Sequence, residues 1–394
     1  MKNVKKVIAV FLTVLLFAGM FTGCSNQGNT AEPAGGDTQG GSEENAEIIK
    51  IAYIGPLTGN NTLYGQTQQN AIQLAVEEIN AQGGINGAKV VVEWHDDKSD
   101  PKETVVLAGK VCDDDDVISV FGPFSSTSAM AAAQTFIDAK MPVCSASVSH
   151  PDWSNLGEGY FFRGDSTQEQ MMEAYSNFMY NDLGVRKIAA YYVQSDWGIA
   201  VYEQLERFFT ALGGEIVYAD LFPLETKDFS APLAKFKDKD FELFFLASMI
   251  TEGSLIVNQM RKLGIDQPLL TNNSLMMKEY LDIVGDNAEG QMLLSYFADE
   301  GNTEKFEKFR AAYESKYPGK SVDTHAFNTY DLISVMFEAL RHSGNDREKF
   351  VAEMHKIKDF QGLQTKISIL ENGDMEKPFT PIVVKDGKWT VWEK

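Results

Sequence analysis

Residues 48–97 read "IIKIAYIGPLTGNNTLYGQTQQNAIQLAVEEINAQGGINGAKVVVEWHDD" and contain a strand, a helix and a second strand in succession. The first apolar, β-branched run ends at the Gly-Pro pair 55–56, which predicts a buried strand followed by a loop. Apolar residues then recur at helical spacing over 72–79, before a glycine stop at Gly83, and residues 88–97 predict the next strand. This order is typical of a parallel βαβ unit and therefore predicts an α/β fold.

The same alternation continues along the chain. Helices and strands are expected in turn at residues 101–114, 117–123, 125–140 and 141–149. A second series begins near Tyr160, with elements at residues 166–184, 187–193, 198–214, 215–222, 230–240, 241–248 and 252–264. Residues 365–393 differ, because strands joined by Asn-Gly-Asp and Lys-Asp-Gly turns predict hairpins. We therefore predict two α/β lobes with parallel sheets.

The N-terminal residues 1–23 have the pattern of a secretory signal. Three lysines precede an apolar run from Val7 to Phe21, and this run is shorter than the roughly 20 residues that a membrane-spanning helix needs. It ends in Thr-Gly-Cys, which is similar to the bacterial lipoprotein signal, although Phe21 stands where that family usually has leucine. We expect Cys24 to become a lipidated N-terminus. An ordinary cleaved signal with an unrelated cysteine is the alternative.

Residues 24–47 are rich in Gly, Ser, Asn and Glu and contain no aromatic residue. Such a segment cannot bury enough apolar surface to fold, so we expect a flexible linker behind the lipid anchor. The protein is then extracytoplasmic, held at the outer face of the cytoplasmic membrane or in the periplasm.

Composition excludes one class of function. The chain has 35 basic and 56 acidic residues, for a net charge of −21, whereas a nucleic-acid partner requires a basic face. Besides Cys24, the cysteines are Cys112 and Cys144. Two cysteines are no disulfide framework, so a disulfide between them and two buried free thiols both stay open.

Common signatures of enzymes and metal sites are missing from the sequence. It has no G-x-S-x-G elbow, no phosphate-binding loop and no H-E-x-x-H helix, and its five histidines lack ligand spacing. His95, Asp96 and Asp97 follow a strand beside a turn, where polar side chains usually cap backbone groups. An exported hydrolase using Ser149 and His150 is disfavoured, because neighbouring strand residues point to opposite faces. We expect no enzymatic activity, no metal and no cofactor.

Hydroxyl side chains follow two neighbouring strands. In "VFGPFSSTSAMAAAQ", residues 120–134, three hydroxyl residues at 125–127 stand where a helix begins, and free N–H groups there can hold an anion. Simple helix capping is the equally open alternative. Ser147 and Ser149 follow the next strand and should reach the same sheet edge. Neither turn carries Lys or Arg, so a carboxylate is a better ligand than a phosphate.

Aromatic side chains stand at two other loop ends. Tyr64 lies in "TLYGQ" and Trp197 in "SDWGIA", and both would supply the apolar walls of a small-molecule site. For each of them, packing without ligand contact is the alternative.

An ordered set of stretches resembles a known family. Residues 64–101, 120–133, 228–237 and 241–264 together are similar to the leucine/isoleucine/valine-binding proteins, the extracytoplasmic receptors of branched-chain amino acid ABC importers. The resemblance runs from about Ile48 to the C-terminus. It implies a type I periplasmic-binding-protein fold, in which two Rossmann-like lobes close on a ligand. Three crossover strands would join the lobes, near Gly164, Ser295 and Gln361. The implied lobes are residues 48–164 with 296–361, and residues 165–295 with 362–394.

The resemblance also implies site residues. The α-carboxylate of the ligand would be held by Ser126, Ser147 and Ser149, and aromatic contacts would come from Tyr64 and Trp197.

Two positions depart from the family pattern. The acidic residue that meets the α-ammonium group falls on Asn273, a neutral amide that cannot offset the cost of burying a charge. Where many relatives have Gly-Gly-Tyr, this chain has Ala-Ser followed by Met249. The ammonium group would then be met by Asp196 or Glu252, or the ligand has no amino group.

The sequence therefore predicts a lipid-anchored, monomeric substrate-binding protein of an ABC importer, which presents its ligand to a membrane permease. A branched-chain or other apolar amino acid is the first candidate for that ligand. A carboxylate or amide without the α-amino group is the second, and a ligand-sensing role in a signalling system is a further alternative.

Overall fold

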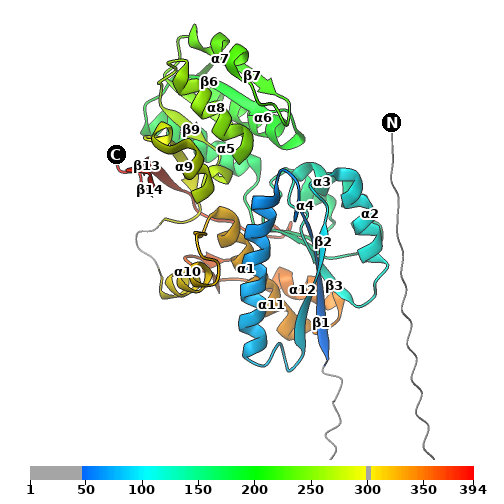
Figure 1. Cartoon of the computed structure of the whole chain (residues 1–394). Coiled ribbons are helices and arrows are strands. Elements are labelled where there is room, and N and C mark those ends of the chain that lie inside the picture. The colour runs from blue at the N-terminus through cyan, green and yellow to red at the C-terminus, as the bar shows by residue number, and fades with distance from the viewer. Residues whose placement is uncertain (1–46, 299–302) are drawn as a thin grey trace, which may run out of the picture. The chain divides into compact units, whose positions relative to one another are not determined.

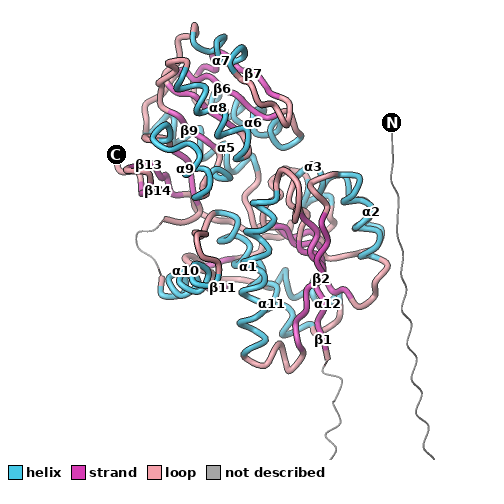
Figure 2. Tube along the Cα trace, in the orientation of Figure 1, coloured by secondary structure: helices cyan, strands magenta, loops and turns pink. Residues whose placement is uncertain are grey.

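The computed structural model describes residues 47–298 and 303–394. The signal predicted at 1–23, the lipidation predicted at Cys24 and the linker predicted at 24–47 lie outside the described residues, apart from Glu47. The described chain forms a five-stranded sheet, a seven-stranded sheet and a small hairpin (Figures 1 and 2). Both large sheets consist mainly of parallel strands with helices on their faces, as the alternation of elements predicts.

The first sheet has the order β2-β1-β3-β4-β5 and is parallel throughout. Its strands and the helices between them are β1 (Ile48–Gly55), α1 (Thr62–Ala81), β2 (Lys89–Asp96), α2 (Pro101–Cys112), β3 (Val117–Phe121), α3 (Ser126–Asp138), β4 (Val143–Ser145), α4 (Trp153–Leu156) and β5 (Phe161–Arg163). Of the strand predicted at residues 141–149, only the three residues of β4 are extended, and the serines beyond them lie in a loop.

The second sheet has the order β14-β13-β10-β9-β8-β6-β7. It contains α5 (Gln168–Asn177), β6 (Lys187–Val193), α6 (Asp196–Ala211), β7 (Glu215–Phe222), α7 (Ser230–Lys237), β8 (Leu243–Ala247), α8 (Ile250–Lys262), β9 (Leu269–Thr271), α9 (Lys278–Val284), β10 (Met292–Ser295), β13 (Thr380–Lys385) and β14 (Lys388–Val391), with short helices η1 (Phe178–Asp182), η2 (Asn273–Leu275) and η3 (Gly285–Ala288). The Lys-Asp-Gly turn joins β13 and β14 as an antiparallel hairpin, as predicted.

Three further helices and a hairpin complete the described chain. They are α10 (Glu304–Lys316), α11 (Thr324–Ser343), α12 (Arg347–Lys356), β11 (Phe360–Gln361) and β12 (Lys366–Ile367). Helix α11 runs beside α1 and packs on the first sheet (Figure 1). We call residues 48–164 and 324–375 the first lobe, and residues 168–295 and 380–394 the second lobe.

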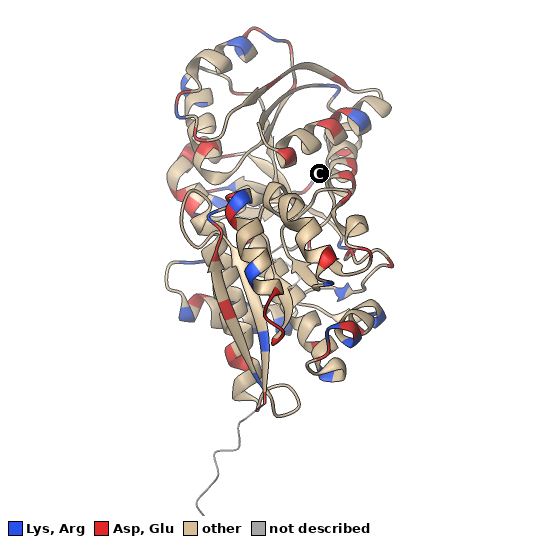
Figure 3. Cartoon of the chain, turned by 90° about the vertical axis from the view of Figure 1, so that its right-hand side faces the viewer, with Lys and Arg blue, Asp and Glu red and all other residues tan. Residues whose placement is uncertain are grey.

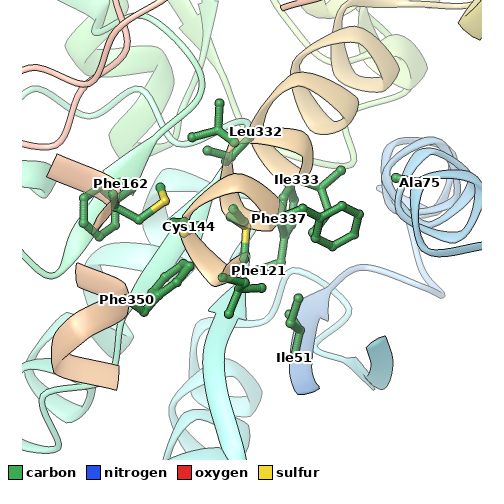
Figure 4. Packing of buried hydrophobic residues seen from close by; sticks show 14 of the residues in the cluster. Ile51, Ala75, Phe121, Cys144, Phe162, Leu332, Ile333, Phe337 and Phe350 are labelled. Carbon is green, nitrogen blue, oxygen red and sulfur yellow. The ribbon is translucent and has the colours of Figure 1, made fainter. Parts of the chain in front are cut away.

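Both faces of each sheet are covered, which explains the near-continuous apolar strands. On one face of the first sheet, Phe121 and Cys144 pack with Leu332 and Phe337 of α11 (Figure 4). On its other face, α2, α3 and α4 cover a second cluster, which Cys112 borders. Cys112 and Cys144 are thus free thiols on opposite faces of one sheet, so the structure has no disulfide between them. Cys144 is buried, as the free-thiol alternative expected, whereas Cys112 is half-buried.

The chain passes between the lobes after Arg163, after Ser295 and between Met375 and Thr380. The first two passages are held together, because Ser166 N–H donates to the Tyr296 hydroxyl over 3.1 Å. The family resemblance implies a third passage near Gln361. In the structure Ile367, Ile369 and Met375 still pack in the core of the first sheet, because β11 and β12 form a hairpin there.

Charged positions are interspersed over the helices of both lobes, without a continuous basic stripe on the face shown (Figure 3). In the described part of the chain, no helix combines the length and the apolar character needed to cross a membrane.

Candidate ligand-binding site

A cavity of about 280 Å³ lies where the carboxyl ends of strands from both sheets meet. Loops after β1 to β5 contribute from the first sheet, and loops after β6 to β9 contribute from the second. Ligands of open α/β sheets bind at such strand ends. The lining residues are Asn61, Ser99, Pro101, Phe124, Ser125, Ser126, Thr127, Ser147, Ser149, Asp165, Met171, Val193, Gln194, Ser195, Asp196, Trp197, Leu224, Met249, Asn273, Ser274 and His325.

The serines at the start of α3 divide into a cap and a free group. Ser125 is the N-cap, and its Oγ accepts a hydrogen bond from Ser128 N–H over 3.1 Å. Ser126 follows it, is 3% exposed and lines the cavity, and its Oγ has no hydrogen-bond partner among the described residues. A buried hydroxyl without a partner is unfavourable. The Ser126 hydroxyl is therefore available to a ligand, whereas Ser125 stabilises the helix.

Ser145 fixes the loop that follows β4 against the loop that follows β3. Its Oγ donates to Pro123 O over 2.8 Å and accepts from Val148 N–H over 3.2 Å. Ser147 and Ser149 line the cavity on either side of Val148, and Ser149 is 1% exposed. The two hydroxyl-bearing turns therefore meet at one edge of the cavity, as their positions after neighbouring strands predict.

The second lobe contributes the start of α6 and the ends of β8 and β9. Ser195 caps α6 by accepting from Gly198 N–H over 3.1 Å, which leaves Asp196 and Trp197 in the first helical turn beside the cavity. Met249 follows β8, and Asn273 follows β9. All of these residues except Ser195 are among the predicted candidates.

Asp165 and Asp196 are the charged residues of the lining, which contains no Lys or Arg among the residues that the structure describes. Asp196 is exposed, whereas Asp165 is 6% exposed, on the first passage between the lobes. The Asp165 carboxylate accepts from Ser166 N–H over 2.9 Å and from the Tyr296 hydroxyl. Burial raises the pKa of Asp165 to about 6, against the opposing effect of these hydrogen bonds. The sequence pattern did not indicate Asp165, which follows a strand of only three residues.

His325 is a second lining residue that the sequence did not indicate. It lies in the first turn of α11, and the N-cap Asp323 accepts from His325 N–H and Ala326 N–H, each over 2.8 Å. Thr67 of α1 also donates to Asp323 over 2.9 Å, which fixes the start of the helix. Burial lowers the pKa of His325 to about 4, so the imidazole is neutral at neutral pH. Nothing in the local sequence relates this helix to the strand ends.

Tyr64 and Glu252 do not line the cavity. Tyr64 stacks behind Phe124, with ring centroids 5.1 Å apart, and its hydroxyl accepts from Ile250 N–H of the second lobe over 2.9 Å. The Glu252 carboxylate accepts from Glu225 N–H over 2.9 Å. Tyr64 therefore supports the cavity wall and links the lobes, and Glu252 holds a loop of its own lobe. The positions of Tyr64 and Glu252 both depend on packing between segments that are distant in the sequence.

The polar residues at the end of β2 cap backbone groups, as expected. Asp97 accepts from Ser99 N–H over 2.8 Å and from the Thr104 hydroxyl over 3.0 Å, and Asp96 accepts from Leu57 N–H over 2.9 Å. Among the described residues, no group of His, Cys, Asp and Glu side chains is arranged to hold a metal ion.

Comparison with known proteins gives a consistent family. A family model described as periplasmic binding protein matches residues 48–388. A Leu/Ile/Val-binding protein homologue from Brucella suis is 26% identical over 329 residues, which cover 82% of this chain and 86% of the relative.

Two solved structures are similar in fold and sequence. The branched-chain amino acid transporter substrate binding protein LivJ from Streptococcus pneumoniae, in complex with isoleucine, has a TM-score of 0.81 at 27% identity and covers 88% of this chain and 99% of its own. A solute binding protein of an ABC transporter from Rhodopseudomonas palustris, in complex with 3,4-dihydroxybenzoic acid, has a TM-score of 0.79 at 25% identity. The match covers 87% of this chain and 95% of that protein.

Proposed function

Because this chain belongs to the periplasmic binding protein family, we propose that it is the lipid-anchored receptor of an ABC importer and that it captures a small amino acid between its lobes. The observation that carries the proposal is the cavity, whose lining combines buried hydroxyls, a buried carboxylate and apolar walls without a basic residue. Its volume of about 280 Å³ lies at the small end of ligand pockets, which suits a small molecule.

The ligand carboxylate is assigned to the first lobe. The Ser126 hydroxyl is buried without a partner, Ser149 lies across from it on the neighbouring loop, and the N-terminus of α3 supplies the positive end of a helix dipole. Hydrogen bonds from hydroxyl and N–H groups stabilise a carboxylate without a basic side chain.

The ligand ammonium group is assigned to Asp165. Its carboxylate is buried at the cavity wall, where an opposite charge interacts more strongly than it does in water. Asp165 would thereby supply the charge that Asn273 lacks. Asp196 is exposed and screened by solvent, so its contribution is expected to be smaller.

The rest of the lining combines polar residues, such as Asn61 and Gln194, with apolar side chains that suit a short side chain of the ligand. The apolar residues include Phe124, Met171, Val193, Trp197 and Met249. The isoleucine complex of the Streptococcus pneumoniae relative supports an amino acid of branched-chain size as a first candidate.

A thermal-shift screen of residues 47–394 tests the proposal. The panel contains the common amino acids and, for each, the matched carboxylic acid without the amino group. A ligand at 100 times its Kd adds about 2.7 kcal/mol to the free energy of unfolding, which is a readily measured increase in Tm. Stabilisation by amino acids and not by their des-amino analogues is expected. Stabilisation by the des-amino acids alone would overturn the assignment of Asp165.

A plain carboxylate is the second candidate. The neutral Asn273 favours it, as does the 3,4-dihydroxybenzoic acid bound by the Rhodopseudomonas palustris relative. The same screen separates the two candidates, because Asp165 would repel a ligand that carries only negative charge.

Anchoring and transport need their own tests. Cys24→Ala should release the protein from the membrane fraction, and continued retention would contradict lipidation at Cys24. Loss of ligand uptake by cells that lack the receptor, with uptake restored by the wild-type chain, would support coupling to a permease. The receptor is expected to act as a monomer, which size-exclusion chromatography with light scattering checks.

A further inference from the structure

His325 presents one ring nitrogen to a protein partner and leaves the other without one. The imidazole is 4% exposed and lines the cavity. Nδ1 lies 3.4 Å from Ser147 Oγ, whereas Nε2 is buried and has no hydrogen-bond partner among the described residues. The ring packs edge-on against Tyr64 and Phe124, with centroid distances of 5.0 and 5.4 Å. The imidazole is thus held in place, and its unpaired nitrogen is available to a ligand.

A chain of hydrogen bonds leads to Nδ1 from the core of the first lobe. The Tyr53 hydroxyl lies 3.1 Å from Gln68 Oε1, and Gln68 Nε2 lies 2.7 Å from Ser147 Oγ. Tyr53 and Gln68 are fully buried. The series of hydrogen bonds therefore connects Tyr53 to Gln68, Gln68 to Ser147, and Ser147 to His325.

The direction of the hydrogen bonds in this series follows from the requirement that each donated proton has an acceptor. If Tyr53 O–H donates to Gln68 Oε1, the Gln68 amide donates to Ser147 Oγ, and the Ser147 hydroxyl donates to His325 Nδ1. The reverse direction would leave the buried Tyr53 O–H without an acceptor, since Gln68 is its hydrogen-bond partner in the described part of the chain. Ser147 Oγ could also accept from an Nδ1–H while Tyr53 donates to Gln68, but the Ser147 proton would then have no acceptor among the described residues, whereas donation to Nδ1 satisfies it. A buried donor without an acceptor is unfavourable. The favoured direction makes Nδ1 an acceptor and puts the single proton of the neutral imidazole on Nε2.

Asn273 brings a second unpaired group to the lining of the cavity. It is 4% exposed, and its Nδ2 has no hydrogen-bond partner among the described residues. Thr324, the neighbour of His325 in α11, donates from its hydroxyl to Asn273 O over 3.4 Å. Helix α11 of the first lobe and η2 of the second lobe are therefore in contact, and each contributes to the cavity lining a residue with a buried, unpaired side-chain nitrogen.

We propose that His325 Nε2–H and the Asn273 amide bind a hydrogen-bond-accepting oxygen on the side chain of the ligand. The inference rests on the proposed function and narrows it to amino acids whose side chain carries a hydroxyl, carbonyl or amide oxygen. A hydrocarbon side chain of the same shape would bury both donors without an acceptor. Specificity of this kind is strong, because a site built to hydrogen-bond a group discriminates against the analogue that lacks it.

Isothermal titration with two matched pairs of amino acids tests the specificity. Threonine and valine differ by a hydroxyl in place of a methyl group, and asparagine and leucine differ by an amide in place of two methyl groups. In at least one pair the oxygen-bearing member should bind tenfold or more tightly than the hydrocarbon. Equal or tighter binding of the hydrocarbon in both pairs would overturn the inference and leave the proposed function intact. If none of the four amino acids binds, the inference is rejected, and the thermal-shift screen with the full panel decides the proposed function separately.

Two substitutions show whether His325 carries the preference. His325→Phe keeps a flat ring and removes the donor, so the oxygen-bearing member should lose its advantage. His325→Gln keeps an N–H near the position of Nε2 and should retain most of it. Retention of the preference in His325→Phe would overturn the assignment. Thermal unfolding of both variants without ligand separates a loss of binding from a loss of folding.

The tautomer of His325 is measurable without any ligand. Proton-nitrogen correlation NMR of protein labelled with ¹⁵N-histidine should show an Nε2–H tautomer at neutral pH, in a signal that His325→Gln removes. Gln68→Leu breaks the hydrogen-bond chain and should shift this signal toward a mixture of tautomers. An Nδ1–H tautomer in the wild-type protein would overturn the inference.

Discussion

The first-lobe half of the cavity is lined mainly by polar side chains, whereas the second-lobe half combines apolar side chains with polar ones. Ser126, Ser149 and His325 are each less than 5% exposed and are held by helix starts or by loop hydrogen bonds. Trp197 and Met249 of the second lobe are half-buried, and Leu224 is 56% exposed. Polar groups fixed in place by the fold lose little freedom when a ligand binds, whereas exposed apolar groups gain burial only from ligand contact or lobe closure. The difference indicates that the first lobe, the adjoining Asp165 and Asn273 determine which ligand is bound, and that the apolar side chains of the second lobe mainly cover it.

The largest expected effect is that of Asp165→Asn. It removes the buried charge assigned to the ligand ammonium group and should weaken amino-acid binding by about 2 to 5 kcal/mol, which is roughly 30-fold or more. Isothermal titration measures the loss. Binding of a des-amino acid should be unchanged or stronger, because the repulsive carboxylate is gone. Equal losses for both ligand types would indicate structural damage instead of a lost ion pair.

Ser126→Ala should come next, and Ser125→Ala is its matched control. Loss of the Ser126 hydroxyl should weaken binding by about 1 to 3 kcal/mol and leave the free energy of unfolding nearly unchanged. Loss of the Ser125 cap should lower the free energy of unfolding by about 1 kcal/mol with little effect on Kd. Urea unfolding measures the free energy of unfolding of both variants, and titration calorimetry measures their Kd values. Exchange of the two effects would mean that the roles of the serines are reversed.

The pH dependence of binding should report Asp165. Its pKa of about 6 in the empty site lies above the ordinary value, so the carboxylate is increasingly protonated as the pH falls below 6. An ammonium ligand should therefore bind up to about tenfold more weakly for each pH unit below 6, and binding should level off above pH 7. The charges of Lys377 and Arg163 act on Asp165, and the neutral Tyr296 donates a hydrogen bond to it. The profile of Asp165→Asn should be flat where the wild-type profile falls.

Asp323 provides a check on that interpretation, because burial raises its pKa to about 7 and it caps α11 behind the cavity. Any pH dependence that comes from Asp323 should persist in Asp165→Asn. A wild-type profile and an Asp165→Asn profile of the same shape would therefore attribute the titration to Asp323.

The smallest effect is expected in the second lobe. Met249→Leu conserves volume at a half-buried position and should change the binding free energy by less than about 1.5 kcal/mol. Titration calorimetry with the same amino acid checks this value. A loss larger than that of Ser126→Ala would remove the contrast between the two halves of the cavity.

Local patterns in the sequence predicted much of the fold and part of the site. The periodicity of apolar residues and the turn residues predicted the alternating strands and helices and the terminal hairpin, because these features depend on neighbours along the chain. The resemblance added the type I fold, which the comparisons confirm. Ser126, Ser147 and Ser149 line the cavity because residues that follow neighbouring parallel strands must share a sheet edge.

What the sequence by itself determined, then, is the alternation of elements and the hydroxyl residues at two strand ends. Only the tertiary structure decided which serine is a cap and which is free, since that depends on the geometry of a few backbone N–H groups at the start of α3. It also brought Asp165 and His325 to the cavity, and it placed Tyr64 behind Phe124. These positions arise from contacts between segments far apart in the chain. Spacing along the sequence carries no information about them, because the packing of α1 and α11 on one sheet decides where each side chain lies.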